Sequence, residues 1–229
     1  MIDSEKYYVE VRKPLENIRN YSYAWHLRNN VSIFFRQSFE RSLIKALNEN
    51  NIHLDDKKIL DVGCGKGGTL RHFVDLGANP TSCYGIDISD YRIQEAKRQN
   101  PLINYQTMSS EQIAYPDSFF DIVLQFTAFS SMGSEDIREK TAQEIGRVLS
   151  QHGYIIWYDI SRAKKSSQFP LPISATAIKS YFPNYQFIAH EKLHARLAGA
   201  LAKKSYFLAL LIDKLLPFQK TNILCIMKK

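Results

Sequence analysis

The residues with the clearest chemical capability are two carboxylates at the ends of two apolar runs. Asp61 lies in the run Ile59–Val62, directly before the glycine-rich stretch 63–68, and Asp87 lies in the next apolar run, 84–89. Glycines let the backbone approach a ligand closely, and the amides at a helix start can bind an anion. A carboxylate in the position of Asp87 can accept bonds from both hydroxyls of a ribose. The pattern therefore predicts a site for a nucleotide-type cofactor.

These residues can act together only if the fold brings the two runs to one place. In a parallel sheet the carboxyl ends of the strands meet at one edge, where ligands bind. Apolar runs that alternate with segments of helical periodicity predict such an α/β fold. The expected strands are 59–62, 84–89, 103–108, 120–126, 154–160, 185–193 and 221–229. The expected helices are 23–48, 69–76, 90–100, 134–149 and 173–182.

The glycine pattern fits two kinds of cofactor loop. Gly63, Gly65 and Gly68 also satisfy the pattern of a dinucleotide-binding loop, so a NAD-dependent oxidoreductase is an alternative. The surrounding motifs, however, resemble those of the class I S-adenosylmethionine-dependent methyltransferases. They are Asp-Val-Gly-Cys-Gly-Lys-Gly at 61–67, Gly-Ile-Asp-Ile-Ser at 85–89, the stretch 108–123 and Arg-Val-Leu-Ser-Gln-His-Gly at 147–153.

This resemblance implies a Rossmann-like sheet of seven strands, mostly parallel with an antiparallel last strand, and helices on both faces. It also implies S-adenosylmethionine as cofactor, S-adenosylhomocysteine as product and no metal. Ser109 stands where the family usually has an Asp that accepts the adenine amino group, and Glu111 is a nearby substitute. The residues expected to bind the cofactor are Asp61, Gly63, Cys64, Gly65, Gly67, Asp87, Ile88, Ser109, Ser110, Glu111 and Gln125.

The residues expected to handle the methyl acceptor are spread along the chain. Asp159 and His26 are the candidate catalytic bases for an acceptor that must lose a proton. Both have a structural alternative, since Asp159 can cap the segment after its strand and a single histidine is commonly structural. The residues expected to contact the substrate are Tyr21, Trp25, Thr127, Phe129 and Tyr158.

Composition indicates a globular chain. It has 229 residues, of which 45% are hydrophobic and 23% charged, and its three cysteines have no metal-ligand spacing. The polar start of the chain does not resemble a signal peptide, so we expect a cytoplasmic protein. We expect one domain over 1–229, with an N-terminal helical lid at 1–50, a core at 51–193 and 221–229, and a helical insert at 194–220.

The insert carries much of the positive charge. The net charge is +7, and the last forty residues hold eight basic and two acidic side chains. Leucines within the insert predict a single apolar helical stripe; they are Leu197, Leu201, Leu208, Leu211 and Leu215. Such a stripe fits an acceptor pocket, a dimer face, a peripheral membrane contact or ordinary packing on the sheet. The charge fits an anionic partner or simply a solvated face.

The resemblance is greatest to small-molecule methyltransferases of the ubiquinone-biosynthesis-like group. It implies transfer of a methyl group to an O, N or C nucleophile of a secondary metabolite, glycan or quinone-like acceptor, by a monomer or homodimer. Alternatives are an RNA or protein methyltransferase and a non-catalytic binding protein of the same fold. Nucleic acid is disfavoured, because 125–128 reads Gln-Phe-Thr-Ala instead of the Asn-Pro-Pro-Tyr of many base-amine methyltransferases.

Overall fold

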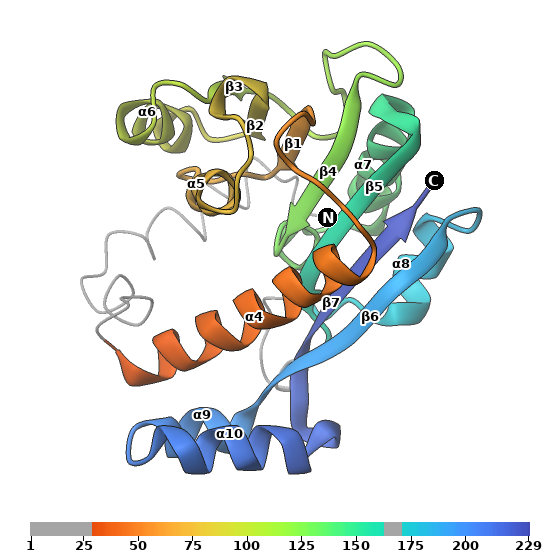
Figure 1. The fold of residues 1–229 in the computed structure, drawn as a ribbon. Coiled ribbons are helices and arrows are strands. Elements are labelled where there is room, and N and C mark those ends of the chain that lie inside the picture. The colour runs from red at the N-terminus through yellow and green to blue at the C-terminus, as the bar shows by residue number, and fades with distance from the viewer. Residues whose placement is uncertain (1–28, 163–170) are drawn as a thin grey trace.

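The computed structural model describes residues 29–162 and 171–229 (Figure 1). The predictions for Tyr21, Trp25 and His26 therefore lie outside the described residues. The described strands form one seven-stranded sheet in the order β3-β2-β1-β4-β5-β7-β6. Strand β7 pairs antiparallel with both β5 and β6, and all other neighbours pair parallel. The predicted Rossmann-like sheet with an antiparallel last strand is confirmed.

The strands and helices follow the predicted order. The strands are β1 (Ile59–Val62), β2 (Cys83–Asp87), β3 (Asn104–Thr107), β4 (Phe120–Phe126), β5 (Leu149–Ile160), β6 (Gln186–Ala195) and β7 (Lys220–Lys228). The α-helices are α4 (Asn30–Glu49), α5 (Gly68–Asp75), α6 (Asp90–Gln99), α7 (Glu135–Val148), α8 (Ala175–Tyr181), α9 (Arg196–Ala202) and α10 (Tyr206–Leu215). Short 3₁₀ turns are η2 (Pro80–Ser82), η3 (Phe129–Ser131) and η4 (Pro217–Gln219).

Helices cover both faces of the sheet because the central strands are apolar on both sides. Successive residues of β4 point to opposite faces, as a strand requires. Ile122 and Leu124 pack in a cluster with α4, α5 and α6, whereas Val123 packs in a cluster with α7 and α8. The core is thus two apolar layers, one on each side of the sheet.

The order of the strands creates a crevice at their carboxyl edge. In the sheet β1 lies between β2 and β4, and Val62 is in register with Ile86 and Gln125. The loops after these three strands therefore leave the sheet side by side. From β1 the strand order runs to β2 and β3 on one side and to β4 on the other. In open α/β sheets, ligands bind at the point where the strand order reverses in this way.

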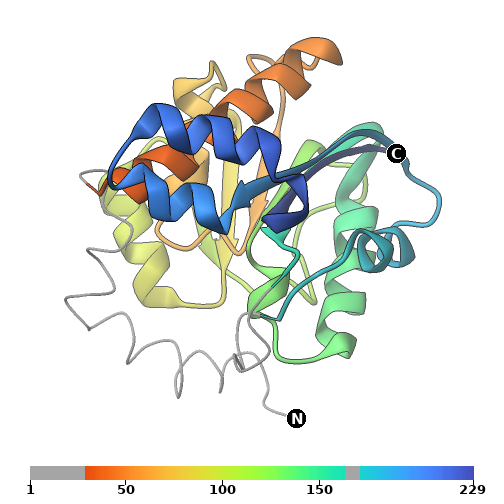
Figure 2. The same cartoon turned by 90° about the horizontal axis from the view of Figure 1, so that it is seen from below.

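The insert differs from the single stripe that the leucines predict. It forms two helices, α9 and α10, because the chain turns at Lys203–Ser205 and Ser205 caps the second helix by accepting a bond from the Leu208 amide at 3.3 Å. Both helices lie against one another and against the α4 side of the molecule (Figures 1 and 2). No helix in the described ranges is long and apolar enough to cross a membrane.

The fully buried residues of the insert are small. Ala198, Ala202 and Ala209 pack in a cluster with Phe34 of α4, and the partly buried Leu201, Leu210 and Ile212 pack against it. A Cβ atom at Gly199 would overlap the ring of Phe35, so this helix approaches α4 as closely as glycine allows. The side of the helix pair that meets α4 is therefore the one with the shortest side chains.

This contact yields a stability prediction. Gly199→Leu should lower the free energy of unfolding by about 1–3 kcal/mol, because the added side chain must displace Phe35. Ala200→Leu, at the neighbouring exposed position, is the matched control and should change stability little. Denaturant unfolding of both variants measures the difference. Equal stability of the two variants would contradict the tight contact between α9 and α4.

Candidate functional site

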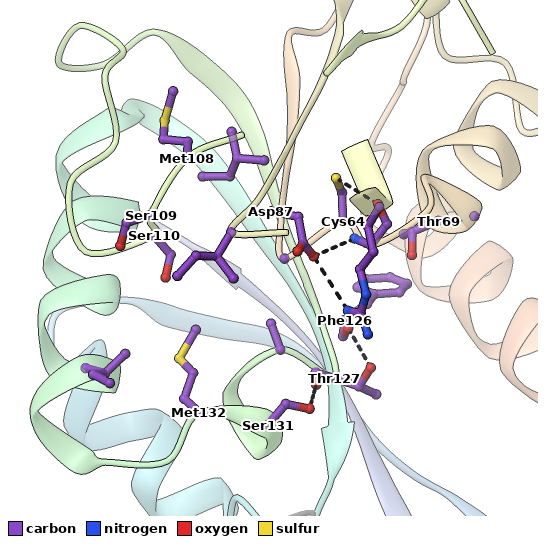
Figure 3. Close-up of a pocket in the computed structure, with 18 residues that line it drawn as sticks. Cys64, Thr69, Asp87, Met108, Ser109, Ser110, Phe126, Thr127, Ser131 and Met132 are labelled. Atoms are coloured by element: carbon purple, nitrogen blue, oxygen red, sulfur yellow. Dashed lines mark hydrogen bonds and ion pairs between the residues drawn. The ribbon is translucent and has the colours of Figure 1, made fainter. Parts of the chain in front are cut away.

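A cavity of about 320 Å³ lies at the carboxyl edge of the sheet. Figure 3 shows Met108, Ser109 and Ser110 on one side of it and Cys64 and Thr69 on the other. This volume falls within the range of small-molecule sites. The lining residues come from the ends of β1, β2, β3 and β4 and from the starts of the following helices. They are Gly63, Cys64, Gly65, Gly68, Thr69, Ile86, Asp87, Ile88, Arg92, Met108, Ser109, Ser110, Phe126, Thr127, Ala128, Ser131, Met132 and Ile137.

The glycine loop is tied to the neighbouring strand β2. Gly63 and Cys64 donate their amides to the Ile86 carbonyl at 2.8 and 2.9 Å. Gly63 has φ +75°, and a Cβ atom there would lie 2.7 Å from the Cβ of Ala128. Glycine is needed at this position for its backbone angle and because the loop after β4 approaches so closely. The result is a narrow floor of bare backbone between β1 and β4.

Asp87 joins the loop to the end of β2. One carboxylate oxygen accepts the Gly65 amide at 2.9 Å, and the other accepts the Ser89 amide at 2.9 Å. The side chain is 6% exposed and lines the cavity (Figure 3). A carboxylate offers about four acceptor positions. These two amides therefore leave Asp87 with acceptor capacity for a ligand.

Asp61 has an unusual environment. Its side chain is 1% exposed, and neither carboxylate oxygen has a hydrogen-bond partner among the described residues. Burial, with a further contribution from the charge of Asp87, raises the pKa of Asp61 to about 8. Asp61 does not line the cavity, but it lies at the end of β1, directly before the glycine loop. An isolated buried carboxylate is costly, so this position favours a cationic or hydrogen-bond-donating ligand group close to the loop.

The part of the cavity formed by the loop after β3 combines apolar side chains with two serine hydroxyls. Ser109 and Ser110 line it together with Met108 and Met132. The Ser110 hydroxyl is 2.9 Å from that of Thr141 on α7, which connects this loop to the opposite helix layer. Glu111 does not line the cavity; its amide donates to the Ser109 hydroxyl at 3.3 Å. This part of the cavity therefore offers apolar methionine side chains together with hydroxyl groups.

The end of β4 provides the remaining wall. Phe126, Thr127, Ser131 and Met132 line the cavity there. Thr127 has φ 60°, which is rare for a β-branched residue and stores backbone strain. Its carbonyl accepts the Ser130 and Ser131 hydroxyls at 3.3 and 3.0 Å, so the loop holds this conformation. Strain of this kind is concentrated at functional sites, and Thr127 was predicted to contact the substrate.

The predicted catalytic residue Asp159 is buried beneath this wall. It is 0% exposed and does not line the cavity. Its carboxylate accepts the side-chain amide of Gln125 at 3.0 Å, the Ser130 amide at 3.2 Å and the Ile160 amide at 2.7 Å. Burial raises the pKa of Asp159, and the hydrogen bonds oppose this shift. In the described structure Asp159 and Gln125 support the turn after β4 from below.

Tyr158 and Phe129 also lie in the core. The Tyr158 hydroxyl is 3.0 Å from His194 Nδ1, and His194 Nε2 is 2.9 Å from the Phe35 carbonyl. Because a carbonyl only accepts, Nε2 donates and Nδ1 accepts the tyrosine proton. Burial lowers the pKa of His194 to about 4, which keeps the ring neutral. Phe129 is 0% exposed and packs on Trp157 with ring centroids 4.5 Å apart.

The structure thus brings most predicted cofactor residues together. Gly63, Cys64, Gly65, Asp87, Ile88, Ser109 and Ser110 line the cavity, as does Thr127 from the predicted substrate set. Gly67 does not line it; this residue is the N-cap of α5 and has φ +75°. The other described predictions do not line it: Asp61, Glu111, Gln125, Phe129, Tyr158 and Asp159.

Sequence reasoning missed several lining residues. Arg92 on α6 is the most notable, since its guanidinium lies 3.8 Å from the Asp87 carboxylate. Its place in the first turn of the helix after β2 was a usable signal, because that turn faces the same crevice. The others were Gly68, Thr69, Ile86, Met108, Phe126, Ala128, Ser131, Met132 and Ile137. No group of three or more metal-ligating side chains occurs within 29–162 and 171–229.

Comparisons with known proteins agree with this geometry. Residues 60–157 match the family model described as a methyltransferase domain. A phthiotriol/phenolphthiotriol dimycocerosates methyltransferase of Mycobacterium leprae is 21% identical over 168 residues, which are 72% of this chain and 58% of that protein. A malonyl-[acyl-carrier protein] O-methyltransferase of Enterobacter lignolyticus is 28% identical over 142 residues, which are 62% of this chain and 53% of that protein.

A third relative has a macromolecular substrate in its name. The eEF1A lysine and N-terminal methyltransferase of Bos taurus is 29% identical over 104 residues, which are 44% of this chain and 14% of that protein. The matched region thus spans between 14% and 58% of the length of these three relatives.

Solved structures share the fold at low identity. An S-adenosylmethionine-dependent methyltransferase from Mesorhizobium loti superposes with a TM-score of 0.58 at 15% identity, covering 81% of this chain and 96% of that one. The [4+2]-cyclase SpnF superposes with a TM-score of 0.61 at 15% identity, covering 84% of this chain and 82% of that one. The second case shows that this fold also supports other chemistry.

The first prediction for the site concerns Asp87. Asp87→Ala should weaken binding of S-adenosylhomocysteine at least about tenfold, because it removes an acceptor for the ligand and releases the Gly65 amide. Asp90→Ala removes a neighbouring exposed carboxylate outside the cavity and is the matched control. Isothermal titration calorimetry measures both affinities. Unchanged affinity in Asp87→Ala would remove Asp87 from the site.

The second prediction concerns the protonation of Asp61. Its pKa is higher in the folded chain than in the unfolded chain, so it lowers stability as pH rises between the two values. Asp61→Asn removes this term. The melting temperature of Asp61→Asn relative to the wild type should therefore increase from about pH 5 to about pH 8. Thermal unfolding without ligand measures it, with exposed Asp56→Asn as control; a difference independent of pH would contradict the buried charge.

Proposed function

We propose that this chain, whose residues 60–157 match a methyltransferase domain, transfers the methyl group of S-adenosylmethionine to a small-molecule acceptor. The observation that carries this proposal is the continuity of the cavity. It runs from the glycine loop and Asp87 to Thr127 and Ser131 at the end of β4. A cofactor held at the first end presents its reactive group toward the second.

The residues at the first end suit the parts of the cofactor. We assign Asp87 to the ribose hydroxyls, the backbone around Gly63 and Gly65 to the amino-acid portion, and the surface between Met108 and Met132 to adenine. Burial raises the pKa of Asp61 to about 8, and a cationic portion of the ligand close to the loop would favour its charged form and compensate its unsatisfied oxygens. When bound, S-adenosylmethionine supplies an electrophilic methyl group on a sulfonium.

The chain then has to align the acceptor with that methyl group. We assign this task to Phe126, Thr127 and Ser131, which line the cavity beside the cofactor loop. Holding two reactants in line can contribute several kcal/mol to lowering the barrier, about 7 kcal/mol in well-oriented cases. The strained Thr127 backbone is maintained by its own hydroxyl neighbours, so the wall is preorganised before the acceptor arrives.

Few of the described side chains that line the cavity could act as a base that removes a proton from the acceptor. Cys64, Asp87 and Arg92 are the titratable side chains that line the described cavity. Burial raises the pKa of Cys64, and Asp87 is engaged with two amides. We therefore assign Asp159 a positioning role through the Ser130 amide and retain His26 as the candidate base. Acceptors with a lone pair that is already free need no base.

The relatives support a small acceptor. Two relatives that match more than half of this chain are named for phthiotriol/phenolphthiotriol dimycocerosates and for malonyl-[acyl-carrier protein]. The relative named for a protein substrate matches 44% of this chain. A protein methyltransferase is the second candidate, because that relative and the net charge of +7 favour it.

A transfer assay separates these candidates. The chain is incubated with S-adenosylmethionine labelled in its methyl group and, separately, with small O, N and C nucleophiles, total RNA and total protein. Label in solvent-extracted small molecules, reduced by Asp87→Ala and not by Asp90→Ala, is the expected result. Label in precipitated protein or RNA would contradict the small-molecule assignment. Absence of S-adenosylhomocysteine binding would favour a binding protein, and a melting-temperature shift with NAD alone would favour an oxidoreductase.

A further inference from the structure

The exposed apolar side chains of this protein are concentrated on the insert. Ten large hydrophobic side chains are exposed in the described ranges, and seven of them lie between Leu197 and Phe218. Phe207 is 78% exposed, Phe218 is 63% exposed and Leu215 is 61% exposed. Isolated exposed leucines need no explanation, but a cluster of aromatic and aliphatic groups on one element does.

This apolar surface results from how the insert packs. The buried positions of α9 and α10 are small, with Ala198, Gly199, Ala202 and Ala209 facing inward. Side chains three, four and seven positions apart share a helix face, so Leu208, Leu211 and Leu215 lie on one side of α10. They are between 41% and 61% exposed. Figure 2 shows the two helices as the outermost layer at this end of the molecule.

The exposed charge around this surface is positive. Arg196, Lys203, Lys204 and Lys214 are all exposed. Asp213 is the one acidic residue between 196 and 220, and it is turned inward. Its carboxylate accepts the Ala195 amide at 2.8 Å and lies 3.8 Å from the Lys220 ammonium. An apolar face with a basic rim results, which we call the insert face (residues 196–218).

We propose that the insert face docks the protein on an anionic lipid bilayer. Phenylalanine and leucine side chains would enter the boundary between head groups and acyl chains, while the lysines meet anionic head groups. Ten residues of α10 span only about 15 Å, so the helix lies along the surface. A second copy of the chain is a poorer occupant, since it would bring the same four positive side chains against one another.

The insert face lies near the edge of the sheet that holds the cavity. Strand β6 runs parallel to β4, because both β5 and β6 pair antiparallel with β7 and β5 pairs parallel with β4. Helix α9 begins where β6 ends, so the insert leaves the sheet at the same edge as the cavity. Docking through the insert face therefore brings that edge toward the bilayer. If the proposed methyl transfer holds, this geometry suits an acceptor with a lipid-soluble portion.

Vesicle flotation with the full chain tests the docking. The protein is mixed with vesicles of phosphatidylcholine alone or of phosphatidylcholine with phosphatidylglycerol, at low and high salt. We expect flotation with the anionic vesicles at low salt, little with the neutral vesicles, and a decrease at high salt. No dependence on lipid charge, or no flotation at all, would overturn the proposal.

Paired variants identify the surface. Phe207→Ser with Leu215→Ser should reduce flotation about tenfold or more, whereas Leu102→Ser, which is as exposed as Leu215 at 61%, should not. Lys203→Gln with Lys204→Gln should weaken binding by a similar factor, and Lys45→Gln with Lys97→Gln should not. Equal flotation of the insert and control variants would contradict the insert face as the docking surface.

Two control measurements distinguish a loss of vesicle binding from a loss of folding or of cofactor binding. Each variant should retain the wild-type melting temperature and its affinity for S-adenosylhomocysteine, because the cavity lies outside the insert. Loss of flotation with retained cofactor binding supports the docking even if no acceptor is found. Sedimentation velocity tests whether a second copy of the chain covers the insert face instead. Concentration-dependent dimers that are abolished by Phe207→Ser with Leu215→Ser, together with no vesicle binding, would overturn the bilayer proposal in favour of a dimer.

Discussion

The hydrogen bond between the Asp87 carboxylate and the Gly65 amide is the contact on which the cavity depends. It joins the end of β2 to the loop after β1 at 2.9 Å. The same side chain receives the Ser89 amide, so it also sets the entry into α6. Burying a carboxylate without hydrogen bonds costs free energy. By using backbone amides for this purpose, the chain holds an acceptor group at the cavity while fixing the shape of its floor.

A second constraint comes from the loop after β4. The Ala128 side chain fills the space that a Cβ at position 63 would need. The turn that follows is held from beneath by Asp159, through the Ser130 amide. The glycine loop after β1 and the turn after β4 are therefore both held in place by contacts with the sheet. Cofactor and acceptor ends share one rigid scaffold, which is what an in-line transfer requires.

The insert follows a different physical rule from the rest of the chain. Elsewhere the larger apolar side chains point into the core and the polar ones point outward. In α9 and α10 the buried residues are Ala198, Gly199, Ala202 and Ala209, while Leu197, Phe207, Leu208, Leu211 and Leu215 are exposed. A close approach of helix backbones to α4 stabilises this arrangement. The apolar surface that it exposes has the basic rim expected for contact with anionic lipid.

The amino-acid sequence was enough to predict the fold class, with its antiparallel last strand, and the position of the cofactor loop. Strands β1 and β4 have the predicted bounds, because short apolar runs between glycines and polar turns have few alternatives. Gly63, Gly65 and Asp87 could be found in the same way, since backbone approach and ribose binding need particular residue types.

Only the tertiary structure decided the orientation of the remaining side chains. Strand-end residues such as Asp159 and Tyr158 have the chemistry of a site, but their contacts are with Ser130 and His194 in the interior. Arg92 has no motif of its own and reaches the cavity because α6 starts beside Asp87. The leucine periodicity of the insert predicted one apolar helical stripe, whereas the chain forms two helices, α9 and α10. The turn at Ser205 and the space available against Phe35 favour small residues inside, and neither depends on hydrophobic periodicity alone.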